Sequence, residues 1–109
     1  MKAVPSEAER VMVSFSEFGL PEVPLVGRYL YTRAHPPLRQ HVHQNAFEAC
    51  VLQRGTQTYT VGSARLDLVA GDMIITKPGE IHGTDIEPEN RGSLYWVQFL
   101  RPFQGHPFL

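Results

Sequence analysis

The sequence lacks the features that would indicate a membrane protein, a disulfide-rich secreted domain or a nucleic-acid-binding surface. Among its 109 residues Cys50 is the only cysteine, so no internal disulfide can form and a reducing compartment is expected. No apolar run approaches the roughly 20 residues of a membrane helix. A formal net charge of −1 provides no basic patch for a phosphate backbone. We therefore expect a cytoplasmic chain that contacts neither a membrane nor, by itself, DNA.

Helical periodicity, internal repeats and long charged tracts are also scarce, which favours one compact β-rich domain. Short apolar or alternating runs predict strands at 11–15, 25–31, 40–43, 47–53, 56–61, 64–69, 73–76 and 93–100. Glycine signals predict turns at Gly55, at 62–63 and at 70–72. Many short strands with turns between them are typical of a sandwich or barrel.

Two short blocks contain residues suited to binding a metal. His41 and His43 lie two apart, so on a strand their side chains would point the same way. Glu48 adds an oxygen ligand and His82, after a Pro-Gly turn, a further nitrogen. Such a set suits a divalent transition metal, Fe(II), Mn(II), Ni(II), Cu(II) or Zn(II).

These blocks resemble the two motifs of the cupin superfamily. The first motif is matched at His41, His43, Glu48 and Gly55, although His35 stands where its opening glycine would be. The second is matched at Gly71, Gly79 and His82. Lys77 replaces its proline, and Ile86 its asparagine. The resemblance implies an all-β fold, a cupin-type double-stranded β-helix (jelly-roll) barrel, with a four-residue metal site.

The segment from Pro24 to Phe99 is similar to the N-terminal sensor domain of AraC-type transcriptional regulators. The similarity rests on 27–29, 51–59, 71–72, 77–82 and 94–99. It implies a small-molecule effector inside the barrel, a homodimer, and DNA binding through a C-terminal helix-turn-helix part absent from this chain. We expect one domain over 1–109, with an N-terminal arm or edge strand at 1–23, a barrel core at 24–100 and a C-terminal extension at 101–109. Edge strands at 11–15 or 93–100 are candidates for the dimer contact.

Four further residues are candidates for the ligand pocket. Cys50 is expected to share the face of Glu48, with a packed thiol as the alternative. Glu80 lies two residues before His82 and could share its face. Tyr59 and Trp96 fall on predicted strands, where core or interface packing is the default for aromatic residues.

Alternatives remain open for the site and for the function. A buried Glu48 would be stabilised by a cation, by a protonated histidine or by water at an open barrel mouth. The same ligands would suit a small stand-alone metal-dependent cupin enzyme, a dioxygenase or isomerase, although the motifs contain no evident general acid or base. A third alternative is a barrel that only dimerises.

Overall fold

The computed structural model describes residues 8–19 and 22–100, and its regular structure is almost entirely β-strand. The elements are β1 (Ala8–Val13), a 3-10 helix η1 (Phe15–Phe18), β2 (Leu25–Tyr31), β3 (Ala46–Val61), β4 (Ala64–Val69), β5 (Met73–Thr76), β6 (His82–Gly83) and β7 (Gly92–Leu100). All pairings between these strands are antiparallel. The all-β expectation is confirmed. Within the described ranges, no helix is long and apolar enough to cross a membrane.

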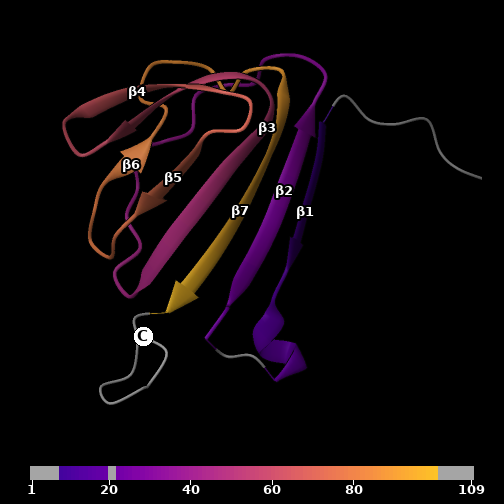
Figure 1. Ribbon diagram of the computed structural model, residues 1–109, viewed down its shortest axis with the longest axis vertical. Coiled ribbons are helices and arrows are strands. Elements are labelled where there is room, and N and C mark those ends of the chain that lie inside the picture. The colour runs from indigo at the N-terminus through magenta and orange to yellow at the C-terminus, as the bar shows by residue number, and fades with distance from the viewer. Residues whose placement is uncertain (1–7, 20–21, 101–109) are drawn as a thin grey trace, which may run out of the picture.

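The long strand β3 connects two groups of strands. The order is β1-β2-β7-β3-β4, and β5 and β6 also pair with β3. The first part of β3 pairs with β7 and β5, whereas its second part pairs with β4 and β6. In Figure 1, β1, β2 and β7 therefore lie to one side of β3, and β4, β5 and β6 lie to the other.

The turn predicted at Gly55 is wrong, because β3 continues through this residue. Gly55 has a φ of +89° and pairs with Gly92, just after the register shift between Leu52 and Arg54. A Cβ atom at position 55 would lie only 2.5 Å from the Arg91 carbonyl oxygen. The glycine thus permits a bulged, closely packed crossing at which one strand passes from the first group to the second.

The strand predicted at 40–43 is also absent. In this stretch only His41 makes a β-type pairing, an isolated bridge to His82. The other strand predictions agree better, since 25–31, 64–69 and 73–76 coincide with β2, β4 and β5. β7 lies between β2 and β3 and is not an edge strand, whereas β1 is one.

Side-chain alternation gives the sheet β1-β2-β7-β3-β5 an inner and an outer face. Inner residues in one cross-strand row are Met12, Gly27, Trp96, Cys50 and Ile74. Trp96, Cys50 and Ile74 of this row belong to a core completed by further buried side chains, Tyr29, Tyr31, Leu52, Tyr59, Leu68 and Leu94. This core bounds the space in which the candidate site lies.

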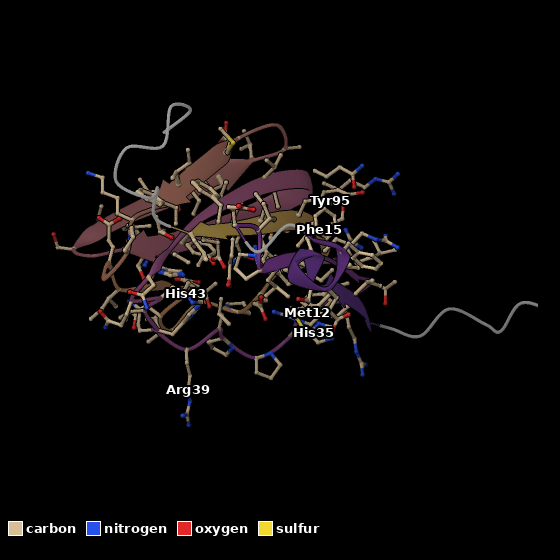
Figure 2. All side chains as sticks on the ribbon, turned by 90° about the horizontal axis from the view of Figure 1, so that it is seen from below. Met12, Phe15, His35, Arg39, His43 and Tyr95 are labelled. Carbon is tan, nitrogen blue, oxygen red and sulfur yellow. The ribbon has the colours of Figure 1, made fainter. Side chains whose placement is uncertain are left out.

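The outer face of the same sheet is mostly apolar and open to solvent. Two neighbouring cross-strand rows form it: Val11, Arg28, Tyr95, Val51, Met73 and Val13, Val26, Val97, Ala49, Ile75. We call these ten residues the outer face. Figure 2 shows Tyr95 on the side of β7 away from His43.

Candidate metal centre

Backbone hydrogen bonds bring the two histidine-bearing segments together. His41 and His82 exchange two bonds, each of 2.9 Å, from the N–H of one to the carbonyl of the other. The Gly79 N–H donates to the His43 carbonyl at 2.9 Å, so the Pro-Gly turn is tied to the same segment. His41 and His43 therefore converge because their loop is bridged to another segment, and strand alternation is not the reason.

The four predicted ligands lie together. The donor atoms of His41, His43, Glu48 and His82 are all within 4.8 Å of one another. Glu48 Oε2 lies 3.3 Å from His43 Nε2, and Glu48 Oε1 lies 3.4 Å from His82 Nε2. Glu48 reaches this point from β3, where it faces Gln98 of β7. Three imidazoles and one carboxylate thus converge from two strands, β3 and β6, and from the loop between β2 and β3.

The outer nitrogens of two histidines are already occupied, which fixes their ring orientation. His41 Nδ1 is 2.8 Å from the Arg39 carbonyl, and His82 Nδ1 is 2.9 Å from the Glu80 carbonyl. Because a carbonyl only accepts, each Nδ1 donates and Nε2 of the neutral ring keeps its lone pair. This arrangement is the one that supports metal-ligating histidines in proteins.

The innermost nitrogen of the cluster has no hydrogen-bond partner. His82 is 1% exposed, and its Nε2 atom is buried without a hydrogen bond in the described part of the chain. Glu48 Oε1 lies 3.4 Å away but does not form a hydrogen bond with it. An unpaired buried polar atom is costly, and a cation at this point would satisfy it together with the carboxylate. The donor set therefore fits a divalent transition metal.

The electrostatics keep Glu48 ionised. Burial by itself would raise the pKa of this carboxyl, which is 6% exposed, but His82, Gln98 and His43 outweigh it and lower the pKa to about 2. Gln98 Nε2 donates to Glu48 Oε2 at 3.0 Å. An ionised carboxylate is the form in which glutamate binds metal.

The pKa values of two of the histidines beside this carboxylate shift in opposite directions. Burial opposes protonation of His82, but the neighbouring Glu48 carboxylate and Glu80 carbonyl raise its pKa. The pKa of His43 is lowered, chiefly by burial, with the other two histidines adding to that effect against Glu48. The Glu48 carboxylate thus favours the protonated form of His82, whereas burial keeps His43 neutral more readily.

The cluster lines one side of a cavity of about 180 Å³. His41, His43, Glu48 and Gln98 reach the cavity, whereas His82 lies behind them. The remaining lining residues are Arg10, Met12, Leu25, Tyr29, Leu38, Cys50, Tyr59, Glu89, Leu94 and Trp96. A small molecule in this space would therefore contact both the cluster and an aromatic wall.

Three of the four pocket candidates line this cavity. Cys50, Tyr59 and Trp96 do so, and Cys50 Sγ donates to Glu48 Oε1 at 3.6 Å. Burial raises the pKa of Cys50, so the thiol stays protonated and is no thiolate ligand. Glu80 lies outside the cavity, and its carboxylate accepts a hydrogen bond from the Lys77 N–H instead. The prediction for Glu80 was wrong because β6 begins only at His82, so strand alternation does not extend back to position 80.

Sequence reasoning missed several cavity residues. Gln98 had a usable signal, since it is the amide residue that interrupts the apolar and aromatic run 94–100 of β7. Arg10, Tyr29 and Glu89 had none, because β1, β2 and the loop before β7 come together only through the strand register.

Comparison with known families identifies the class of domain. Residues 27–103 match the family described as the AraC-like ligand binding domain. The match covers more than half of the chain, and the chain therefore belongs to that family. Among curated proteins, no sequence matches the chain significantly.

Solved structures support the same fold at low sequence identity. A predicted oxalate decarboxylase from Thermotoga maritima is 21% identical, with a TM-score of 0.69 over 86% of this chain and 81% of that one. An RmlC-like cupin from Shewanella frigidimarina is 16% identical, with a TM-score of 0.67 over 94% and 85%. The cupin domain of Cnp3 from Schizosaccharomyces pombe is 11% identical, with a TM-score of 0.70 over 92% and 69%. The chain thus has the cupin fold.

Proposed function

We propose that this chain is the sensor domain of an AraC-type transcriptional regulator and that it binds a divalent transition metal and a small effector inside the barrel. Membership of the AraC-like ligand binding family supports the effector. The observation that carries the metal is the buried, unpaired Nε2 atom of His82 beside the ionised Glu48. His41 and His43 complete the proposed ligand set.

A metal held by these four residues would supply a positive charge with open coordination positions for an oxygen or nitrogen atom of the effector. The chain's own residues do the positioning. The Arg39 and Glu80 carbonyls orient two imidazoles, and Gln98 holds the Glu48 carboxylate toward them. The aromatic wall of the cavity then keeps water from the bound effector.

In a regulator, effector binding must be coupled to DNA binding. We propose that DNA is bound by a C-terminal helix-turn-helix part of a longer cytoplasmic protein, and that residues 1–109 supply one sensing domain. Such coupling is a free energy shared between two sites, so the effector should change the DNA affinity of the intact regulator.

We further propose that the outer face is the contact of a symmetric homodimer. Nine of its ten residues are uncharged, and Val11, Val13, Val51, Met73 and Ile75 are exposed there. Monomeric proteins rarely expose large contiguous apolar patches. A second copy of the same face would remove these side chains from water, as closed two-fold contacts do.

Metal content tests the proposed centre. Untagged wild-type protein should contain about one equivalent of metal by elemental mass spectrometry, and His43→Ala and His82→Ala should lose it. His35→Ala is the matched control, since His35 is a histidine outside the cluster. Chelation should lower the melting temperature of the wild type by roughly 10 °C or more, because ligand at 100 times its Kd adds about 2.7 kcal/mol. Equal metal content in all four proteins would contradict the proposed centre.

A second candidate function is a metal-dependent cupin dioxygenase or isomerase. The observation that favours it is Glu89, a second carboxylate that lines the same cavity and could act as an acid or base. Oxygen uptake by Fe(II)-loaded protein over a panel of phenolic and thiol acids tests this candidate. Turnover that is lost in Glu89→Gln with metal retained would support it, and no uptake across the panel would count against it.

A further inference from the structure

The cavity has two ends of different chemistry. The candidate metal centre forms one end, with Gln98 of β7 beside Glu48. The other end lies near Arg10 of β1, whose cross-strand row contains Leu94 of β7. Leu94 and Gln98 are four residues apart, which corresponds to roughly 13 Å along a strand at about 3.3 Å per residue.

Glu89 supplies a buried acceptor at the second end. Its backbone is fixed by two hydrogen bonds with His35, of 2.8 and 3.1 Å. The residue is only 9% exposed and lines the cavity. Its carboxylate oxygens are not among the fully buried, unpaired atoms of the described residues, which include only His82 Nε2, and the side chain faces the cavity. A carboxylate at the wall of a cavity can accept a hydrogen bond from a donor group of a bound ligand.

Arg10 is held in place near this acceptor. Its Nη1 atom donates to the Tyr31 hydroxyl at 2.9 Å, and its Cζ lies 4.8 Å from the ring centre of Trp96. The guanidinium also acts on Glu89 as an opposing charge. The second end therefore offers the Glu89 carboxylate as an acceptor, beside a guanidinium that is hydrogen-bonded to Tyr31.

The wall between the two ends is apolar and aromatic. Trp96, whose cross-strand row lies between those of Leu94 and Gln98, lines it together with Tyr59, and Tyr29 and Leu94 continue this wall into the second end. The cavity of about 180 Å³ is close to the about 150 Å³ that is known to hold a benzene molecule. The space between the ends is thus suited to a body of one ring.

We infer that the effector is a single-ring acid: its acid group binds at the metal end, and a hydroxyl or amino group at the opposite end of the ring donates a hydrogen bond to Glu89. This inference rests on the proposed metal centre. It adds Glu89 as the residue that decides which ring compounds bind.

Calorimetric titration of the metal-loaded full chain with four acids tests the inference. The probes are benzoate, 4-hydroxybenzoate, 4-(aminomethyl)benzoate and 4-methoxybenzoate. A hydrogen bond to a charged group changes affinity by about 10- to 100-fold, so the hydroxyl and aminomethyl compounds should bind at least about 10-fold tighter than the other two. If the hydroxyl compound binds more tightly than the aminomethyl compound, the effector is a phenol; if the aminomethyl compound binds more tightly, it is an amine.

Variants of Glu89 show whether this residue causes the preference for acids that carry a donor group. Glu89→Leu should bind all four acids alike, and Glu89→Gln should lose the preference for the amine. Glu87→Gln is the matched control, since the Glu87 carboxylate pairs with Arg65 on the surface. Equal binding of the four acids to the wild type, a preference retained in Glu89→Leu, or no binding to fully metal-loaded protein would overturn the inference. Metal content measured on the same samples separates these results from a failure of the metal centre itself.

Discussion

The indole of Trp96 occupies the space that a side chain at Gly27 would need. The two residues face each other across β2 and β7, and a Cβ atom built on Gly27 would overlap the indole ring. The indole can therefore lie against the β2 backbone, where it forms part of the cavity wall. The position of this part of the cavity wall thus depends on Gly27, the first residue of the 27–29 segment that resembles the AraC-type sensor domains.

Gly27→Ala is predicted to destabilise the domain by about 1–3 kcal/mol, the usual cost of overpacking a core. Urea unfolding followed by circular dichroism measures this change. Trp96→Phe in the same chain should recover part of the loss, because the smaller ring leaves room for the added methyl group. A Gly27→Ala protein as stable as the wild type would show that the indole moves aside without cost.

Gln98→Leu is predicted to weaken metal binding by about 10- to 100-fold, the range seen when a residue that orients a metal ligand is lost. The variant leaves all four ligands in place but removes the bond from Gln98 Nε2 to Glu48. Competition with a chromophoric chelator measures the affinity. Gln44→Leu, at an exposed glutamine in the loop before β3, is the control and should bind metal as the wild type does.

The metal-free domain is predicted to lose stability in acid through Glu48. Its pKa is lowered to about 2 in the folded state against 4.5 for the ordinary group. A lowered carboxyl pKa means that the stabilisation is complete above pH 4.5 and is lost as the pH falls toward 2. The loss amounts to about 3 kcal/mol at most, at 1.36 kcal/mol per pKa unit.

Unfolding free energies at several pH values, measured with chelator present, check this prediction. Glu48→Gln should flatten the acid limb of the profile. Glu87→Gln should leave it unchanged, because that carboxylate belongs to a partly exposed surface pair with Arg65. An acid limb equally steep in wild type and Glu48→Gln would assign the loss to other carboxyls.

Local patterns predicted the elements whose ends are marked by local signals. β2, β4 and β5 have the predicted bounds because prolines, glycines and short turns delimit them. Gly55 was misread as a turn because its role depends on Gly92, 37 positions further along the chain, which no local pattern reveals. A glycine between two strand-like runs can therefore mark either a turn or a bulge within one long strand, and only the residue paired with it shows which of the two forms.

The candidate site was predictable to the extent that the motif spacing described it. His41, His43, Glu48 and His82 do lie together, although the expected strand at 40–43 does not exist and an isolated bridge from His41 to His82 of β6 replaces it. The far end of the cavity was not predictable. Glu89 comes together with residues of distant strands only through the three-dimensional register.

The outer face is predicted to hold a homodimer together, and one central substitution should separate it. Val51 lies on β3 between Tyr95 and Met73 of the neighbouring strands and is 37% exposed. Lysine at this position would place two like charges in a two-fold contact, so Val51→Lys should sediment as a monomer at micromolar concentration while the wild type sediments as a dimer. Val69→Lys is the matched control, because Val69 is 54% exposed but lies on β4, outside the outer face. A wild-type monomer, or dissociation by both substitutions, would exclude this face as the specific contact. If Val51→Lys remains a dimer, the contact lies outside the outer face, and the exposed edge of β1 is the next candidate.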